Sequence, residues 1–445
     1  MGHHDTMHTA SAPPMTAAPA RSRLLSILGG SAGNLVEWYD WYAYAAFTLY
    51  FAPVFFPAQD QTAQLLSAGA IFAVGFLMRP IGAWIMGVYA DRRGRKAGLT
   101  LSILMMSAGS ALIAVTPGYD VIGIGAPALL VVARLIQGLS VGGEYGASAT
   151  YLSEMAGAKR RGFWSSFQYV TLIMGQLVAL ALLLVLQASM SEAALESWGW
   201  RIPFALGAVL ALVVLVLRRR LLETEHYLAA KERDGDAPRS GVLTLLKDHP
   251  GAAGLVVALT AGGTLAFYTY STYMQKYLVN SAGFGRQQAS WIMAGALFLF
   301  MALQPAFGAL SDRIGRKPLM IGFGLAGTFG TVPLFRALEQ AHDPISAFAL
   351  VMAALIAVSG YTSINAVVKA ELFPAHIRAL GVALPYAIAN ALFGGSAEYV
   401  ALQLKTWGME GWFYWYVSAL CGVSLLTYIA MSETKVASLI DRDLG

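Results

Sequence analysis

A small set of ionisable side chains lies inside long apolar stretches of the sequence. The basic members are Arg79, Arg134, Lys276 and Lys369, and the acidic members are Glu37, Asp40, Glu144 and Glu398. A charge is costly in an apolar environment, so its presence there indicates a role in binding, charge transfer or gating. The seven histidines all lie outside these stretches. We therefore expect neither a metal nor a cofactor.

Arg79 is the residue that we expect to bind an anionic substrate. It lies roughly 12 Å, at 1.5 Å per residue, from Gly87 at the end of its apolar stretch, close to the middle of a membrane. A guanidinium group there can bind a carboxylate by two parallel hydrogen bonds, which an ammonium group cannot do. The alternative is a structural ion pair with Glu37 or Asp40.

A dianionic substrate needs a second positive or donor group. Lys276 is one candidate, and Tyr273 lies one helical turn before it. Because Lys276 is near the outer end of its stretch, it could instead pair with Glu398 as a gate, or anchor the helix at the interface. We expect Lys369, near the opposite end of its own stretch, to reach toward water. Tyr44 and Gln168 are candidates for neutral hydrogen bonds to a ligand or to neighbouring side chains.

Glu37 and Asp40 are three residues apart and share one side of a helix. Two close carboxylates in an apolar environment repel each other, so we expect at least one to bind a proton near neutral pH. Both are candidate proton carriers. Glu144 lies among Gly142, Gly143 and Gly146, where helices can pack closely, so it is a candidate either for proton coupling or for a structural bond between helices.

The elements that position these residues are predicted from composition and apolar spacing. The chain has 445 residues, of which 57% are hydrophobic and 12% charged, against roughly 25% charged in a soluble domain. About twelve segments have about 20 residues, enough to cross a membrane. They are Leu24–Phe51, Thr62–Val88, Ala97–Val115, Ala126–Leu152, Gly162–Gln187, Trp200–Leu222, Gly251–Asn280, Gln287–Ser311, Pro318–Ala337, Ile345–Phe373, Arg378–Leu402 and Trp412–Met431.

A duplicated charge cluster divides these segments into halves. Gly87–Lys96 reads GVYADRRGRK, and Gly308–Lys317 reads GALSDRIGRK. Glu154 and Glu371 each precede an Arg and a Gly in a second repeated pattern. Such spacing is typical of a duplicated half. We therefore expect an all-α membrane protein of two six-helix bundles, with a disordered tail over 1–23, bundles over 24–222 and 251–431, a linker over 223–250 and a C-terminal tail over 432–445.

Charge also predicts the orientation in the membrane. Taking alternate loops, most of the 30 Lys and Arg fall on one side. This bias predicts that both termini, the linker and both repeated loops are cytoplasmic. The net charge of +5 then reflects topology, and we expect no nucleic-acid partner. We expect a monomer in the lipid bilayer.

These motifs resemble those of the major facilitator superfamily. The two repeated loops match its loop signature, and Arg134-Leu-Ile-Gln-Gly matches its Arg-x-x-Gln-Gly motif. The patterns GNLVEWYD, FLMRPIG, GLSVGGEYG and GGSAEY resemble the metabolite:proton symporters, and among them the carriers of 2-oxoglutarate (α-ketoglutarate) most closely. The resemblance covers nearly the whole chain except the tail and most of the linker. It implies proton-coupled uptake of 2-oxoglutarate across a bacterial inner membrane.

The resemblance also implies roles for further residues. Arg134 matches the family arginine that influences the protonation of a neighbouring carboxylate. The repeated loops are implied to form latches that close the cytoplasmic side, in which aspartates cap helix N-termini and arginines hold acidic partners. The residues concerned are Asp91, Arg95, Glu154, Asp312, Arg316 and Glu371. The alternative is that the loops are topology signals alone.

Three classes of function compete. A symporter exposes a site at the membrane midplane to each side in turn. A channel without coupling does not need the carboxylates in the membrane. The sequence shows no metalloprotease, nucleotide-binding or nucleophile-elbow motif, so we do not expect an enzyme. Within the symporters, the alternatives to 2-oxoglutarate are citrate, shikimate, proline and betaine.

Overall fold

Long apolar segments form helices because a helix satisfies its own backbone hydrogen bonds, which lipid cannot do. The computed structural model describes residues 20–57, 60–93, 95–142, 145, 149–150, 152–153, 157–219, 241–374 and 377–442. Side chains are described in those ranges except at 20–34, 87–88, 90–96, 98–99, 158, 217–219 and 441–442. The predicted N-terminal tail lies outside these residues up to position 19, and α1 begins at Ala20.

Six membrane-crossing units form the N-terminal half. Their helices are α1 (Ala20–Phe55), α2 (Gln61–Arg93), α3 (Arg95–Val115), α5 (Gly125–Val141), α7 (Arg161–Ser165) with α8 (Phe167–Ser189), and α10 (Ile202–Arg219). Short helices lie at turns, namely α4 (Tyr119–Ile122), η1 (Ala158–Arg160), α9 (Glu192–Ser197) and η2 (Gly199–Arg201).

The C-terminal half repeats the plan. Its first unit consists of α13 (Pro250–Phe267), η3 (Tyr268–Tyr273) and α14 (Met274–Asn280), and the next two are α15 (Arg286–Ile314) and α16 (Lys317–Glu339). The fourth unit consists of α17 (Pro344–Thr362) and α18 (Asn365–Glu371). The fifth consists of α19 (Arg378–Ala389), η4 (Asn390–Gly394) and α20 (Ala397–Thr406), and the sixth is α21 (Glu410–Ala430). Two short helices, α12 (Val242–Asp248) and α22 (Leu439–Arg442), flank it.

The count of spans agrees with the prediction. Among the described residues, nine helices are long and apolar enough to cross a membrane, and Thr100–Val115 and Gly125–Val141 are shorter apolar helices. With α1 they make twelve, six in each half. The predicted fold class, two six-helix bundles in a membrane protein, is confirmed.

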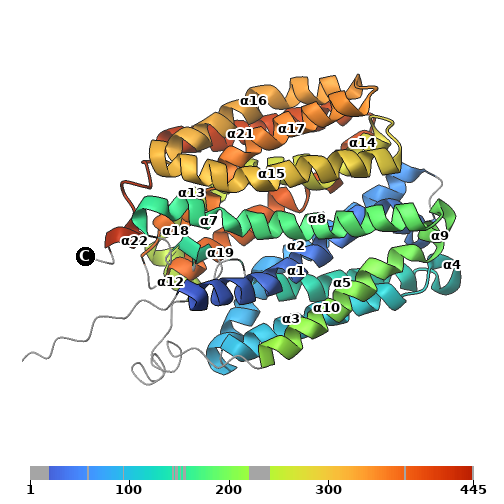
Figure 1. Ribbon diagram of the computed structural model, residues 1–445, viewed down its shortest axis with the longest axis horizontal. Coiled ribbons are helices and arrows are strands. Elements are labelled where there is room, and N and C mark those ends of the chain that lie inside the picture. Colours follow the sequence, from blue (N-terminus) through green and yellow to red (C-terminus); the bar gives the residue numbers. More distant parts are fainter. Residues whose placement is uncertain are drawn as a thin grey trace, which may run out of the picture.

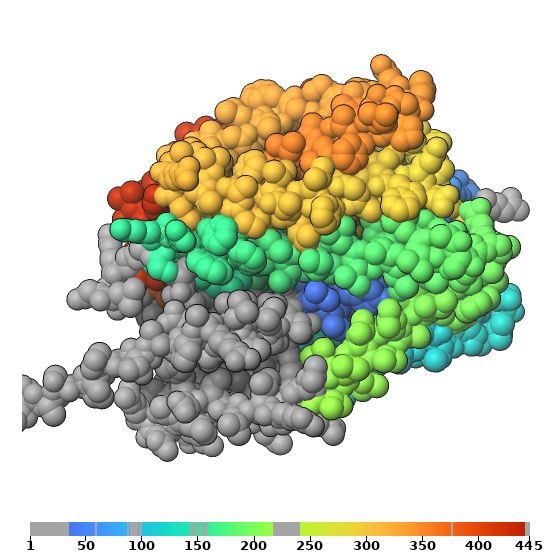
Figure 2. Space-filling model, in the orientation of Figure 1, coloured from blue at the N-terminus to red at the C-terminus, as the bar shows by residue number. Residues whose placement is uncertain are grey.

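The two halves lie side by side along their length (Figure 1). In the space-filling view, α8 lies directly against α15 of the other half (Figure 2). Glycines allow close approach at this junction, because a Cβ on Gly162 would be 2.6 Å from the Gly308 carbonyl oxygen. On the other side of the interface, a Cβ on Gly395 would overlap the ring of Phe76 on α2. Small residues therefore bring the backbones of opposite halves together.

Glycines also fix α2 against α5 within the N-terminal half. A Cβ on Gly138 would overlap the Gly75 carbonyl oxygen, and one on Gly142 would overlap the Arg79 carbonyl oxygen. The backbone that carries Arg79 is therefore held firmly against α5.

Two helices contain a π-helical turn where they face the centre of the molecule. These turns are η3, which interrupts the α13–α14 unit, and η4, which interrupts the α19–α20 unit. Near these turns the two units are joined by a hydrogen bond of 2.5 Å between the side chains of Thr264 on α13 and Asn390 on η4. π-helical turns occur frequently at functional sites, and this pair marks the region described next.

Candidate functional site

Arg79 is buried on α2, with 3% of its surface exposed. Its guanidinium carbon lies 3.8 Å from the ring centre of Phe76 and 4.3 Å from that of Trp41. Among the described residues, Nε and Nη2 donate no hydrogen bond. No ion pair joins Arg79 to Glu37 or Asp40, whose side chains are both described. The alternative of a structural ion pair is therefore not realised in this conformation.

Tyrosine hydroxyls from several helices surround this guanidinium group. Tyr42 of α1, Tyr268 of η3 and Tyr386 of α19 all lie within electrostatic range of Arg79. The Tyr42 and Tyr268 hydroxyls and the Asn390 Nδ2 are buried and make no hydrogen bond of normal geometry among the described residues, although the Tyr268 hydroxyl lies close to Arg79, Asn390 and Tyr42. Buried polar groups are normally paired, so this group of free donors and acceptors fits a polar ligand.

Lys369 on α18 does not reach toward water, so that prediction is wrong. Its side chain is fully buried, and Nζ donates hydrogen bonds to Asn365 Oδ1 at 2.7 Å and to the Tyr145 hydroxyl at 3.2 Å. Nζ also lies 3.8 Å from the ring centre of Tyr386. The lysine turns inward because the stacked rings of Tyr145 and Tyr386, with centres 3.9 Å apart, offer a cation–π contact.

Arg134 and Asp40 belong to one hydrogen-bonded group inside the N-terminal bundle. Arg134 Nη1 donates to Gln137 Oε1 at 2.8 Å, and Gln137 Nε2 donates to Asp40. Ser110 of α3 donates to the other oxygen of the same carboxylate. A change in the charge of Asp40 therefore reaches Arg134 through a single amide side chain.

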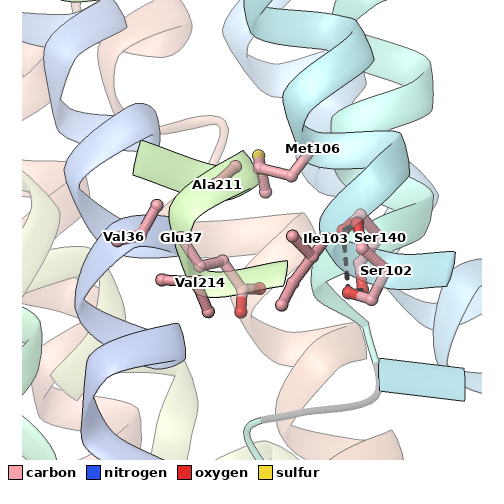
Figure 3. A pocket seen from close by; sticks show the side chains of 8 residues that line it. All are labelled: Val36, Glu37, Ser102, Ile103, Met106, Ser140, Ala211 and Val214. Atoms are coloured by element: carbon pink, nitrogen blue, oxygen red, sulfur yellow. Dashed lines mark hydrogen bonds between the residues drawn. The ribbon is translucent and has the colours of Figure 1, made fainter. Parts of the chain in front are cut away.

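Glu37 lies one turn before Asp40 and faces the same group of helices. It lines a cavity of about 10 Å³ between α1, α3, α5 and α10. Figure 3 shows its carboxylate beside Ile103 and Val214, with the bonded pair Ser102 and Ser140 across the cavity. Both predicted proton carriers thus face the interior of the N-terminal bundle.

The other predicted substrate ligands lie at different places. The Tyr44 hydroxyl donates to the Ala68 carbonyl at 2.9 Å, and its ring centre lies 4.4 Å from the Arg134 guanidinium carbon. Tyr273 packs edge-on against Phe413, and Gln168 is buried on α8. None of these contacts joins them to Arg79.

Lys276 and Glu398 form a buried ion pair with 2.6 Å between Nζ and Oε2. Both residues belong to the C-terminal half, and Glu398 touches the other half at α2, where a Cβ on Gly69 would be 3.4 Å from its Cγ. Of the roles considered for Lys276, the structure shows the contact with Glu398 in this conformation.

The second repeated loop joins the halves at one end of the molecule. Asp312 accepts hydrogen bonds from the backbone nitrogens of Gly162 at 2.8 Å and Phe163 at 2.9 Å, at the start of α7. Arg316 donates to Asp312 at 2.8 Å, and its Nη2 lies 3.5 Å from Glu371 Oε1. The carboxylate therefore caps a helix of the opposite half, as the latch prediction describes.

The C-terminal segment covers this loop. Thr434 donates to Glu371 at 2.6 Å, and Lys435 donates to the Asp312 carbonyl at 2.5 Å. Residue Glu433 accepts from the backbone nitrogens of Arg316 and Lys317, both at 2.9 Å. This part of the segment, expected as a tail, is packed against the latch.

At the opposite end, the halves meet through Arg286 of α15. Its Nη1 lies 3.0 Å from Glu192 and 2.5 Å from Glu196, both on α9. Contacts between the halves thus exist at both ends in this conformation. Four predicted site residues cannot be placed in these contacts: Glu144 and Glu154 lie outside the described residues, as do the side chains of Asp91 and Arg95.

The sequence did not predict that the tyrosines Tyr42, Tyr268 and Tyr386 lie near Arg79, or that Lys369 lies near Tyr386. The available signal was the occurrence of Lys369 in an apolar segment together with Asn365, one turn away on the same helix face. The tyrosines come from segments far apart in the chain, and no local pattern brings them together.

Comparison with known proteins supports the family resemblance. The model of the family described as "Sugar (and other) transporter" matches residues 27–243 and 243–444. The alpha-ketoglutarate permease of Escherichia coli (strain K12) is 55% identical over 417 residues, which cover 94% of this chain and 95% of the permease. A citrate-proton symporter of Salmonella typhi is 33% identical, with 94% and 98% covered.

Solved structures share the fold. A crystal structure of the D-xylose-proton symporter superposes with a TM-score of 0.74 at 22% identity, covering 93% of this chain and 98% of that one. At this identity the likeness concerns the fold. The family match over nearly the whole chain shows that the chain belongs to the sugar (and other) transporter family.

Proposed function

We propose that the protein is a proton-coupled symporter that imports 2-oxoglutarate across a bacterial inner membrane by alternating access. The observation that carries this proposal is the buried guanidinium group of Arg79, which has free hydrogen-bond donors and lies among tyrosine hydroxyls from both halves. A carboxylate is the ligand that such a group binds best. The permease that is 55% identical carries the name of this substrate.

Asp40 is the proposed proton carrier. Its carboxylate is bonded to Ser110 and Gln137, and Gln137 is bonded in turn to Arg134. When Asp40 takes up a proton, the attraction between its charge and the nearby guanidinium group is lost. Because α5 carries Arg134 and packs closely against α2, which carries Arg79, this change is coupled to the substrate site through two adjoining helices. Glu37 and Glu144 are the further candidates for this step.

Alternating access requires that contacts between the halves at each end break in turn. At one end these contacts are the Asp312 cap on α7 and the Arg316–Glu371 pair, and at the other end they include the Arg286 pairs. In the proposed cycle, substrate bound to Arg79 draws the halves together at the centre, and one end then opens. The Lys276–Glu398 pair is proposed to control access of the substrate to its site beside α2.

We further propose that both termini are cytoplasmic. The bias of Lys and Arg toward one set of loops supports this orientation. The helices α22, α12 and α7 all lie at the same end of the molecule (Figure 1), and Asp312 contacts α7. The Arg286 contacts then face the periplasm.

The function is tested by uptake of labelled 2-oxoglutarate into proteoliposomes with an imposed pH gradient. We expect accumulation that an uncoupler abolishes, and inhibition by unlabelled 2-oxoglutarate at lower concentration than by citrate, shikimate, proline or betaine. Uptake that is insensitive to the uncoupler would identify a facilitator. Stronger inhibition by one of the other compounds would reassign the substrate.

A further inference from the structure

Lys369 is a fully buried lysine on the C-terminal side of the interface between the halves. Its hydrogen-bond acceptors are uncharged, namely the Asn365 amide oxygen and the Tyr145 hydroxyl. No carboxylate of the described residues lies within ion-pair distance of Nζ. An ammonium group buried without an acidic partner is unfavourable, and a carboxylate that enters the site offsets that cost.

The surroundings of Lys369 are shared with Arg79. Nζ of Lys369 lies 3.8 Å from the ring centre of Tyr386, and the hydroxyl of the same tyrosine lies within electrostatic range of Arg79. Tyr145, which accepts a hydrogen bond from Lys369, stacks on Tyr386. One tyrosine thus lies between a cation of the N-terminal half and a cation of the C-terminal half.

The two cations have complementary chemistry. The Arg79 guanidinium is planar and suits two parallel hydrogen bonds to one carboxylate, whereas the Lys369 ammonium is a point charge that suits a single strong contact. A dicarboxylate with a short chain presents two anionic ends at a separation that two such groups beside one aromatic ring can bind together. A monocarboxylate uses only one of them.

We propose that Lys369 binds the second carboxylate of the substrate, so that a dicarboxylate bridges the two halves from Arg79 to Lys369. The inference rests on the proposed function and identifies its specificity-determining residue. Binding of a dianion then pulls α18 and α2 toward each other. Selectivity for dicarboxylates over monocarboxylates follows from the presence of both cations.

A competing explanation is that Lys369 is structural and braces α18 against Tyr145. The two explanations differ in ligand specificity. Removing a structural brace weakens the binding of all ligands equally. Removing a residue that binds a carboxylate weakens only the binding of compounds that carry that carboxylate.

The test compares three ligands on the purified protein in lipid nanodiscs by calorimetric titration at pH 7. The ligands are 2-oxoglutarate, 2-oxopentanoate, in which a methyl group replaces the carboxylate at carbon 5, and 4-oxopentanoate, in which a methyl group replaces the carboxylate at carbon 1. The variants are Lys369→Met, Lys369→Gln and, as the control, Lys247→Met, an exposed lysine on α12.

We expect Lys369→Met to bind 2-oxoglutarate about 10- to 100-fold more weakly, the range for loss of one charge-assisted hydrogen bond. One of the two monocarboxylates, the one without the carboxylate that Lys369 binds, should keep its wild-type affinity within about twofold. Lys369→Gln should behave in the same way, and Lys247→Met should match the wild type. The thermal melting curve of each variant shows whether it folds.

Equal weakening of all three ligands, or unchanged binding of 2-oxoglutarate, overturns the inference and leaves the proposed function standing. If the wild-type protein itself shows no preference for 2-oxoglutarate over the two monocarboxylates, the proposed function is wrong and the inference falls with it. If neither neutral variant folds, Lys369→Arg decides the question. A retained preference for 2-oxoglutarate supports the inference, and loss of affinity for all three ligands contradicts it.

Discussion

The buried cations at the centre of the molecule differ from those nearer its ends in what they contact. At the centre, Arg79 and Lys369 lie against aromatic rings and uncharged groups, and no ion pair to either is found among the described residues. Nearer the ends, Lys276 is paired with Glu398, and Arg316 with Asp312 and Glu371. All four cations are at least 97% buried, so burial alone does not separate the two groups.

The difference teaches how one helical scaffold uses the same residue types for two purposes. A buried ion pair satisfies its own charges and can hold a conformation, although it adds little net stability over apolar packing. A buried cation without an acidic partner is costly, and that cost favours the binding of an anion. The position of the carboxylates therefore separates buried cations that already have an acidic partner from those that we propose to bind substrate.

The largest effect is expected when a paired cation loses its partner. Glu398→Gln leaves Lys276 buried without a carboxylate, and we expect the free energy of unfolding to fall by about 3–5 kcal/mol. The double variant Lys276→Met/Glu398→Met removes both charges and should regain most of the loss. Thermal and denaturant unfolding in detergent measure both.

The matched control is Glu339→Gln, which breaks the exposed pair with Arg336. We expect a change of about 1 kcal/mol or less there. If Glu398→Gln is no more destabilised than Glu339→Gln, the buried pair is not the structural element assumed in the comparison.

The next largest effect concerns Arg79, the central cation that we propose to bind substrate. Arg79→Lys keeps the charge but removes the two parallel hydrogen bonds, and we expect binding of 2-oxoglutarate to weaken about 100-fold. Folding should be preserved, because lysine retains an aliphatic stem and a cation that can lie against the ring of Phe76. Titration calorimetry and uptake by proteoliposomes measure the loss, with Arg336→Lys on the exposed surface as the control. Near-normal affinity would rule out the two-point contact.

The sequence predicted the twelve spans and their division into halves, because these depend on apolar length and local spacing. It also placed Glu37 and Asp40 correctly on one side of α1, where they face α3, α5 and α10. Helical periodicity is a local property, so residues three apart can be assigned to one side without knowledge of the fold.

Partners across helices were harder to predict. The sequence does not show that Gln137 and Ser110 bind Asp40, or that Lys369 turns inward to Tyr145 and Tyr386. A lysine stem near a helix end can point toward water or toward the core, and the choice depends on aromatic rings that other helices supply. The π-helical turns η3 and η4, which orient Tyr268 and Asn390, likewise follow from packing between helices and have no distinct sequence signal here.

A smaller effect is expected for the carboxylate of Asp40, which forms no direct ion pair with either group of cations. Asp40→Asn keeps one oxygen that can accept a hydrogen bond from Gln137 and replaces the other with an amide nitrogen, and it cannot carry a proton. With a gradient of one pH unit and the membrane potential held at zero, coupling to one proton supports about tenfold accumulation. We expect the variant to lose that accumulation while exchange of internal for external 2-oxoglutarate continues. Glu37→Gln is measured in parallel, and normal accumulation by both variants would place the proton site elsewhere.

The smallest effect is expected at the exposed end of the molecule, where Arg286 pairs with Glu192 and Glu196. The side chain of Glu192 is 67% exposed and that of Glu196 41% exposed, so solvent and salt screen both pairs. We expect Arg286→Gln to change the uptake rate by less than about fivefold, which corresponds to about 1 kcal/mol. Raising the salt concentration should make the wild type resemble the variant, since ions in solution weaken the same contacts. A loss as large as that of Arg79→Lys, persisting at high salt, would mean that burial of the cation is not what determines its importance, and the comparison between centre and ends would fail.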